Sequence, residues 1–244
     1  PHPLCALAPG ARSSDCATLV GRMPTSTVED YLKCILLEEQ RSPGALVTMG
    51  QIATGLGVAP GTVTAMVKTL ADSGLLAYEP YSGVLLTPSG RQLAAHVLRR
   101  HRLIELFLVN VMGMNWSEVH AEAERMEHAV SDRLVQRMDE MLGFPSVDPH
   151  GDPIPDAHGV VEQPVLASLA DCALGMPVRV ARVEDQSRDF LQLVERRGLK
   201  PGSRLQVESR DEAADAAELH LLDGGERLSL GLRAASKILV EPAT

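Results

Sequence analysis

Aromatic residues are scarce in this chain, at 3% of 244 residues, so leucine, valine, alanine and methionine must fill its core. No apolar run approaches the ~20 residues that a membrane-spanning helix needs, which argues against a transmembrane protein. Residues 1–22 lack the basic start and continuous apolar stretch of a secretory signal, and we expect a disordered extension there. The four cysteines form no C-x-x-C motif and no zinc-ligand spacing, which argues against a zinc finger or a disulfide framework. A reducing cytoplasm is therefore the expected compartment.

The acidic charge of the chain is unevenly distributed. The formal net charge is −9, yet residues 22–102 carry eight Lys/Arg against six Asp/Glu. Residues 103–160 carry three Lys/Arg against eleven Asp/Glu. A mildly basic segment followed by a strongly acidic one suits a module that contacts an anion beside a module that collects cations.

The first ordered pattern is that of a winged helix-turn-helix. A helix is expected to open at residues 25–27, with Thr27 and Asp30 as a capping pair, and to stop at residues 41–44. Two short helices are expected over residues 50–56 and 60–73, joined by a glycine turn. A two-stranded hairpin should follow over residues 75–87, and then a helix to about residue 111.

In a winged helix-turn-helix, the second helix of the motif enters a major groove and the hairpin, or wing, lies against the phosphate backbone. Such shapes also occur in proteins that never touch DNA. Here the outer face of the 60–73 helix is small, polar and free of carboxylates, which favours DNA binding. The residues predicted to contact DNA are Ala59, Pro60, Gly61, Thr62, Thr64 and Lys68, with Tyr81 and Ser82 at the wing.

The acidic segment carries a pattern of potential metal ligands. A helix is expected over residues 117–142. Glu124, Glu127 and His128 follow His120 by four, seven and eight positions, so all four side chains share one face of this helix. His101 and Glu105 pair in the same way on the preceding helix, and a short turn should bring the two helices together, with Asp30 nearby. The alternative is a solvated acidic face with incidental histidines. Nitrogen and oxygen ligands without thiolates indicate a site for Mn(II) or Fe(II).

The C-terminal third of the sequence shows prolines and short β-like segments instead of helical periodicity. Five prolines over residues 145–164 predict a linker, in which His150 and His158 should be solvated. Residues 165–244 show short β-like segments, a hairpin signal at Asp223-Gly224-Gly225 and a helical stretch over 188–199, which together predict a small β-barrel. Cys34 and Cys172 are expected to be buried and unreactive. The expected division is thus an extension (1–22), a winged helix-turn-helix (23–92), a helical domain (93–144), a linker (145–164) and a β-barrel (165–244).

Five segments together resemble the diphtheria toxin repressor family of metal-dependent transcriptional repressors. They are Tyr31 to Leu37, MGQIATGLGVAPGTVTAMVKTLADSGLL, LTPSGRQLA, RRHRLIELFL and EVHAEAERMEHAVSDRL, and the resemblance covers residues 25–160. The C-terminal part resembles that family's Src-homology-3-type, FeoA-like domain. The implied fold is mainly α with a small β part, and the implied assembly is a homodimer that binds double-stranded operator DNA. The apolar residues of the helices over 90–111 and 117–142 would form the dimer interface.

The resemblance also implies two metal sites. The primary, activating site corresponds to Asp30, Glu124, Glu127 and His128. The ancillary site corresponds to His101, Glu105 and His120, to which the C-terminal domain would add Gln186 and Asp189. The iron-responsive branch has methionine and cysteine at the positions of Asp30 and Glu124, and replacing sulfur by hard oxygen favours Mn(II) over Fe(II). Lys33 stands where shorter manganese regulators place a further glutamate, which argues against a two-metal cluster of their kind.

The hypothesis is therefore a cytoplasmic repressor with Mn(II) as corepressor. Without metal the carboxylates would repel one another and leave the first helix free to move, and with metal this helix would be pinned. The alternatives are an iron(II)-responsive member of the family, a repressor that answers an organic ligand, and a helical di-metal enzyme. Di-iron helical bundles carry Glu-x-x-His motifs. None of Glu105, Glu124 and Glu127 has a histidine three positions later, so an enzyme is not expected. An organic substrate is not expected either. No membrane partner is expected either.

Overall fold

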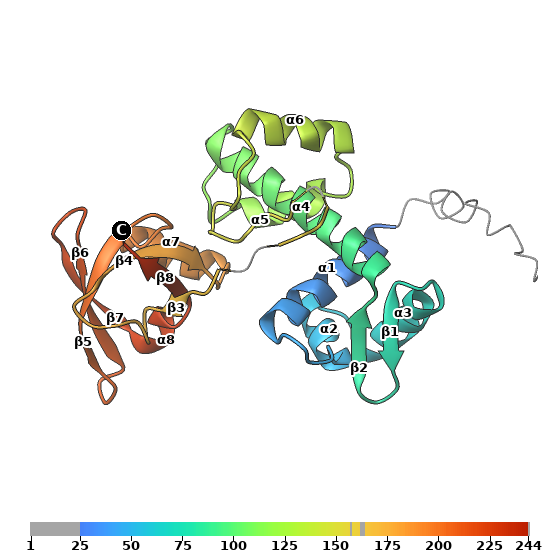
Figure 1. The fold of residues 1–244 in the computed structure, drawn as a ribbon, viewed down its shortest axis with the longest axis horizontal. Helices are drawn as coiled ribbons and strands as arrows, with labels where there is room; N and C mark the ends of the chain where they lie inside the picture. Colours follow the sequence, from blue (N-terminus) through green and yellow to red (C-terminus); the bar gives the residue numbers. More distant parts are fainter. Residues whose placement is uncertain (1–24, 157, 162–163, 244) are drawn as a thin grey trace, which may run out of the picture.

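The computed structural model describes residues 25–156, 158–161 and 164–243, so the predicted extension over residues 1–22 lies outside the described residues. Three parts follow one another along the chain (Figure 1). A winged helical part comes first, a three-helix part that lies above it in this view follows, and a β-sheet part ends the chain. Within the described residues, no helix combines the length and apolar character that crossing a membrane would require.

The winged helix-turn-helix forms as the sequence predicts. Helices α1 (Ser26–Arg41), α2 (Met49–Leu56) and α3 (Pro60–Asp72) precede the antiparallel hairpin of β1 (Leu76–Glu79) and β2 (Gly83–Leu86). The expected capping pair at the start of α1 is wrong, because Thr25 is the N-cap and its side chain accepts a hydrogen bond from the Val28 amide. The apolar faces of these elements meet in one core that includes Leu32, Ile35, Ile52, Val63, Val67, Leu70 and Val84.

The helical part contains a break that the sequence periodicity concealed. After α4 (Pro88–Asn110), the helix expected over residues 117–142 is two helices, α5 (Val119–Met126) and α6 (Asp132–Leu142). Ser131 takes an extended conformation as the N-cap of α6, a position that serine favours, and Asp132 follows in the first turn, where negative charge is stabilised. Glu127 and His128 therefore lie at the corner between the helices and not on one straight stripe.

The proline-containing segment after α6 is packed against α4. Residues 148–155 are buried or half-buried, and two arginines of α4 donate to their carbonyl groups, Arg99 to Pro155 at 2.6 Å and Arg102 to Pro153. The prediction that His150 is solvated is wrong, because its side chain is fully buried, whereas His158 is exposed as expected. Arginine donors to the carbonyl oxygens allow this irregular backbone to be buried without loss of hydrogen bonds.

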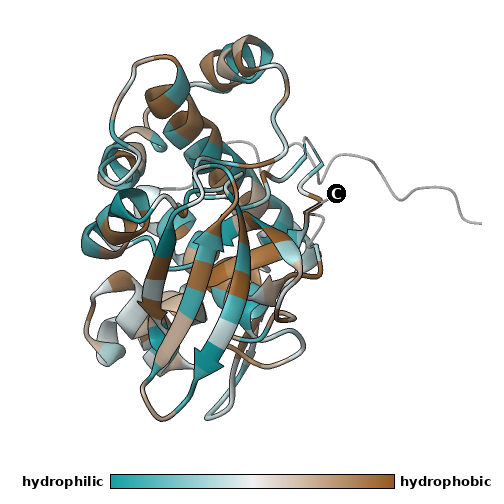
Figure 2. Cartoon of the chain, turned by 90° about the vertical axis from the view of Figure 1, so that its left-hand side faces the viewer, coloured by the Kyte–Doolittle hydropathy of each residue, from teal (hydrophilic) through white to brown (hydrophobic). Residues whose placement is uncertain are grey.

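The C-terminal part is a six-stranded antiparallel sheet in the order β3-β8-β4-β5-β6-β7. Its strands are β3 (Ala167–Ser168), β4 (Pro177–Val183), β5 (Arg204–Asp211), β6 (Ala216–Leu221), β7 (Arg227–Gly231) and β8 (Ile238–Pro242), with helices α7 (Arg188–Arg196) and α8 (Leu232–Ala235). Hydrophobic and hydrophilic residues alternate along the strands (Figure 2), so each strand turns one face to the core.

One side chain from the helical part reaches into the core of the β-sheet part. Trp116, in the loop between α4 and α5, is 5% exposed and belongs to the same apolar cluster as Leu169, Leu191 and Val183. The backbone is joined as well, because the Val183 amide of β4 donates to the His150 carbonyl at 2.9 Å. These contacts dock the sheet on the helical part.

Cys34 and Cys172 are buried as predicted, and burial raises the pKa of the Cys34 thiol to about 11.

Candidate metal centre and DNA-contacting surface

The first candidate metal group, which we call the α1–α5 group, consists of Asp30, Glu127 and His128. His128 Nε2 lies 2.9 Å from Asp30 Oδ1 and 3.4 Å from Glu127 Oε1. On the other side of the ring, Nδ1 lies 2.6 Å from a carboxylate oxygen of Glu29. Because a carboxylate accepts the Nδ1 proton, Nε2 is left as the metal-binding atom of the ring. The group thus joins the DNA-binding part, through α1, to the corner after α5.

The second group, the α4–α5 group, consists of His101, Glu105 and His120. Glu105 Oε1 lies 3.0 Å from His101 Nε2 and 3.0 Å from His120 Nδ1. The other nitrogen of His101 lies 2.5 Å from Glu127 Oε2, so this ring links the two groups. Burial opposes a charge on His101, but the Glu105 carboxylate and the hydrogen bonds to Glu105 and Glu127 raise its pKa to about 9.

A third group, which the sequence reasoning missed, consists of Glu105, Asp148 and His150, all buried. His150 Nε2 bonds to the Trp116 carbonyl at 3.0 Å, which leaves Nδ1 facing the two carboxylates at 3.9 and 4.0 Å. Glu105 Oε2, Asp148 Oδ2 and His150 Nδ1 all lack a hydrogen-bond partner. The available sequence signal was Asp148-Pro149-His150-Gly151-Asp152, a dense run of ligand types.

The residues of the third group fit a cation. Buried polar atoms without partners are rare and costly. Two of them, Glu105 Oε2 and His150 Nδ1, lie 3.9 Å apart, while the third, Asp148 Oδ2, lies 3.8 Å from Arg102 Nε. Burial and the nearby carboxylates of Asp152 and Glu105 hold the pKa of Asp148 well above its usual range. A cation beside Glu105 Oε2 and His150 Nδ1 would satisfy both of these atoms, and its charge would favour the carboxylate form of Asp148. The donors are nitrogen and oxygen only, which suits Mn(II) or Fe(II).

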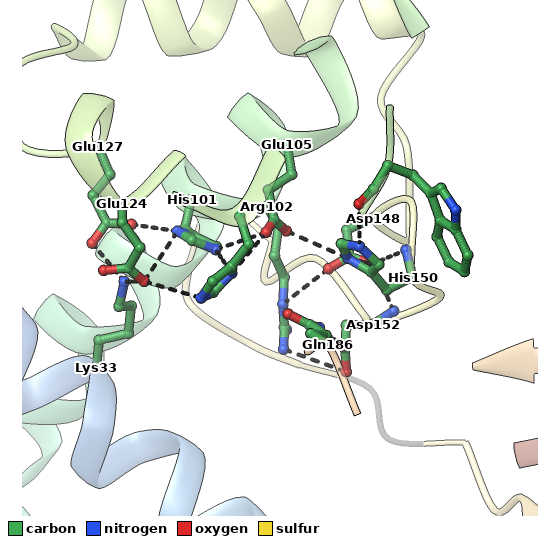
Figure 3. Close-up of polar contacts among 12 residues, drawn as sticks. Lys33, His101, Arg102, Glu105, Glu124, Glu127, Asp148, His150, Asp152 and Gln186 are labelled. Atoms are coloured by element: carbon green, nitrogen blue, oxygen red, sulfur yellow. Dashed lines mark hydrogen bonds and ion pairs between the residues drawn. The ribbon is translucent and has the colours of Figure 1, made fainter. Parts of the chain in front are cut away.

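Glu124 is held by a lysine instead of joining the α1–α5 group. Its Oε1 lies 2.7 Å from Lys33 Nζ, which also lies 2.6 Å from Glu127 Oε1 (Figure 3). Burial works against the charge on Lys33, yet Glu127 and Glu124 hold its pKa above the ordinary value. The Lys33 ammonium therefore offsets part of the repulsion that the sequence reasoning expected between Glu124 and Glu127 without metal.

The two residues proposed from the C-terminal domain lie apart from these groups. Gln186 donates to Asp152 Oδ2 at 2.7 Å, and Asp189 is exposed in the first turn of α7. Within the described part of the chain, neither is a member of a candidate metal group. Gln186 does line a cleft of about 1090 Å³ that side chains of all three groups also border, including Asp30, His101, Glu105, His120 and Asp148. A dissolved ion could reach the groups through this polar cleft.

The predicted DNA contacts lie at the start and along the outer face of α3 and at the tip of the β1–β2 hairpin. Pro60 occupies the first turn of α3, whose N-cap Ala59 makes no side-chain capping bond, and the hairpin tip presents Tyr81, which is fully exposed. Of the predicted residues, only Thr64 is half-buried, and its hydroxyl donates to the Pro60 carbonyl at 3.3 Å. The exposed ones are Ala59, Pro60, Gly61, Thr62, Lys68, Tyr81 and Ser82. The start of α3 carries neither a side-chain cap nor a carboxylate, so a phosphate can approach it.

The fold and the site together define a metal-responsive DNA-binding protein, since α1 carries both a candidate metal ligand and part of the winged core. Three family models match the chain in the same order. Residues 23–84 match the N-terminal DNA binding domain of the iron dependent repressors, and residues 87–156 match their metal binding and dimerisation domain. Residues 167–242 match the FeoA domain.

Individual relatives match along most of their length. The iron-dependent repressor IdeR of Mycobacterium leprae is 32% identical over 228 residues, 88% of this chain and 96% of that protein. The diphtheria toxin repressor of Corynebacterium diphtheriae is 32% identical over 197 residues, 76% of this chain and 85% of that protein. The solved structure of a manganese-dependent transcriptional repressor in complex with manganese is 41% identical with a TM-score of 0.81, covering 88% of this chain and 100% of its own.

This chain belongs to the diphtheria toxin repressor family of metal-dependent DNA-binding repressors. The family, the three-part fold and the metal dependence expected from the sequence are thereby confirmed. The family consists of transcriptional repressors and not of enzymes, which sets aside the di-metal enzyme. Its domains account for two partners, DNA and a second copy of the chain.

Proposed function

We propose that the protein is a manganese-dependent repressor that binds double-stranded operator DNA as a homodimer in the cytoplasm, with Mn(II) as corepressor. The observation that carries this proposal is the α1–α5 group, in which Asp30 meets Glu127 and His128 without any sulfur ligand. Carboxylate and imidazole ligands suit Mn(II), whereas thiolate and thioether ligands suit softer ions. The solved relative at 41% identity is itself described as manganese-dependent, which adds support.

Two positions in the chain would hold metal on this proposal. Asp30, Glu127 and His128 would hold the ion that links α1 to α5, and Glu105, Asp148 and His150 would hold another beside α4. Bound metal supplies the positive charge that keeps carboxylates of separate elements together. Glu105 takes part in both the α4–α5 group and the third group. Its Oε1 contacts His101 and His120, and its Oε2 faces His150.

Helix α1 would carry the effect of metal to the DNA-contacting surface. Asp30 lies in its first half, and Glu39 lies near its end. Glu39 is buried, accepts a hydrogen bond from the Leu86 amide of the wing at 2.7 Å and pairs with Arg91 at the start of α4. A fixed α1 therefore fixes the wing and the helix α3 packed beside it, so metal favours one placement of the two α3 helices in the dimer.

Exposed apolar side chains on the helical part support the expected dimer interface. They gather at the ends of α4 and α6 and in the segment after α6, and they comprise Val111, Met112, Leu134, Met141, Phe144 and Val147. Large exposed apolar side chains that cluster on one part of a protein mark an interaction surface. A second copy is the partner that the dimerisation domain of the family requires. A symmetric dimer then reads an operator with two half-sites.

The proposal is tested by capturing fragmented genomic DNA of the source organism on the purified protein. The capture is run with Mn(II), with Fe(II) under anaerobic conditions, and with a chelator. Discrete fragments with Mn(II) and none with the chelator are expected, and capture that ignores metal would refute the switch. Capture with Fe(II) alone would instead identify an iron-responsive repressor.

The ligand argument has its own test. Asp30→Met combined with Glu124→Cys introduces the two sulfur ligands of the iron-responsive branch. The double variant should bind operator DNA at lower Fe(II) and higher Mn(II) concentrations than the unchanged protein, because sulfur favours the softer ion. The matched control is Glu122→Gln on the exposed side of α5, which should leave the metal preference unchanged. An unchanged preference in the double variant would contradict the argument.

A further inference from the structure

Arg100 of α4 is a half-buried cation that contacts three other parts of the chain. Its Nη1 donates to the Glu127 carbonyl at 2.8 Å and lies 3.7 Å from Glu29 Oε2 on α1. Its Nη2 donates to Asp132 Oδ1, in the first turn of α6, at 3.3 Å. One guanidinium group therefore joins α4 to α1, to the corner after α5 and to α6.

The first of these contacts holds the backbone of the corner. Helix α5 ends at Met126, and carbonyl groups at the end of a helix have no amide of a following turn to accept from. Arginine side chains near a helix C-terminus hydrogen-bond such carbonyls and interact favourably with the negative end of the helix dipole. The bond from Arg100 thus fixes the place at which Glu127 and His128 leave the helix.

The second contact leads to the His128 ring. The Glu29 oxygen beside Arg100, Oε2, is the one that lies 2.6 Å from His128 Nδ1. On the far side of the ring, His128 Nε2 lies 2.9 Å from Asp30 Oδ1. The order along this line is guanidinium, carboxylate, imidazole and candidate metal position. A carboxylate that accepts the Nδ1 proton fixes both the tautomer and the orientation of a ligating imidazole.

The chemistry of a guanidinium group suits this place. Its donors point in fixed directions, so one group can serve a carbonyl and two carboxylates, whereas an ammonium is a compact point charge on a flexible chain. Its charge also pairs with Glu29, which is only 8% exposed. In the described residues, the ion pairs of Arg100 are with Glu29 and Asp132, and neither is a member of a candidate metal group. Any effect on metal must therefore pass through the residues that Arg100 holds.

We propose that Arg100 is a positioning residue of the α1–α5 group. It holds Glu29 and the corner carbonyl so that the ligand atoms of Glu127 and His128 face Asp30. Since α4 also carries two members of the α4–α5 group, the same guanidinium fixes one candidate group relative to the other. The inference rests on the proposed function, because it concerns the metal centre that this function requires.

The test follows the His128 ring by nitrogen NMR in the full-length, chelator-treated protein. In the metal-free unchanged protein the ring should carry its proton on Nδ1, and in Arg100→Met it should become a mixture of the two tautomers. A general loss of stability would not produce this change. Arg137→Met, which removes an arginine from an exposed ion pair with Glu140 on α6, is the matched control and should leave the tautomer as it is.

The affinity of the same site is measured in chelator-buffered Mn(II), because the paramagnetic ion broadens the His128 signal when it binds there. Arg100→Met should weaken this binding by roughly 10–100-fold, the usual effect of losing a residue that orients a metal ligand. Combining Arg100→Met with Glu29→Gln should weaken it by less than the two separate losses together, because the two side chains act on the same ring. Arg137→Met should bind as the unchanged protein does.

Arg100→Lys decides the matter if Arg100→Met fails to fold, which far-UV circular dichroism would reveal. This variant keeps the charge but cannot serve the Glu127 carbonyl, Glu29 and Asp132 at once, so it should still bind Mn(II) more weakly than the unchanged protein. An unchanged tautomer and affinity in a folded Arg100 variant, or additive losses in the combined variant, would overturn the inference. Absence of Mn(II) binding by the unchanged protein would instead refute the proposed function, so the two failures are distinct.

Discussion

The imidazole of His150 stacks on the indole of Trp116, with ring centroids 5.4 Å apart and an angle of 27° between the planes. The same imidazole bonds through Nε2 to the Trp116 carbonyl and turns Nδ1 toward Glu105 and Asp148. Trp116 also belongs to the core of the β-sheet part. One pair of residues therefore connects a candidate metal position with the docking of the C-terminal domain.

Trp116 is the one tryptophan in the sequence, so its fluorescence should report metal at the third group. Titration of metal-free protein with Mn(II) is expected to quench or shift the emission, because a paramagnetic ion would bind to the ring stacked on the indole. His150→Ala should abolish the change and weaken this binding by at least ~10-fold, since even residues that only orient a ligand are worth that much. His158→Ala, at an exposed position, is the control. An unaltered response in His150→Ala would place the ion elsewhere.

Glu29 should act as a positioning residue for His128, because its carboxylate lies 2.6 Å from the ring nitrogen that faces away from Asp30. Glu29→Gln removes the charge that orients the ring and should weaken Mn(II) binding at the α1–α5 group by roughly 10–100-fold. The measurement is a competition titration against a fluorescent chelator. Glu122→Gln, at the exposed ion pair with Arg125, should leave the affinity unchanged. Equal affinity of the two variants would contradict this role.

The metal-free protein should lose stability as the pH rises from neutral to about 9. The pKa of His101 is raised from 6.5 to about 9, so its contribution is complete below pH 6.5 and is lost as the pH passes through about 9. The raised pKa of Asp148 acts in the same direction. Urea unfolding in a chelator should show the decline. His101→Gln should flatten it, while His96→Gln, at an exposed position of the same helix, should not.

Lys68 is expected to contact a phosphate, because it is exposed on α3 and is the sole charged residue predicted to contact DNA. Lys68→Ala should weaken binding to all DNA sequences about equally and lower the slope of log affinity against log salt by about 1. Binding measured at several salt concentrations on specific and unrelated duplexes tests this. A loss confined to one base position would show that Lys68 reads a base.

The winged part and most members of the α1–α5 and α4–α5 candidate groups could be predicted because their signals are local. Spacings of four residues place His101 and Glu105 on one helical face whatever the rest of the fold does. The α3 start at Pro60 and the two strands that follow depend on neighbouring residues in the same way. The break between α5 and α6 was missed because an apolar period continued through Ser131, whose N-cap preference was the better signal.

By itself, the amino-acid sequence determined which donor types are present, on which helices they lie, and the family to which the chain belongs. Tertiary structure alone decided how these donors are shared. Lys33 meets Glu127 across 94 positions of sequence, and His150 reaches the Trp116 carbonyl across 34. Such contacts depend on how whole helices pack and on which polar atoms are buried together, and periodicity carries no information about either. The same carboxylates could therefore be counted in the sequence, while the cation that holds two of them became evident only in the fold.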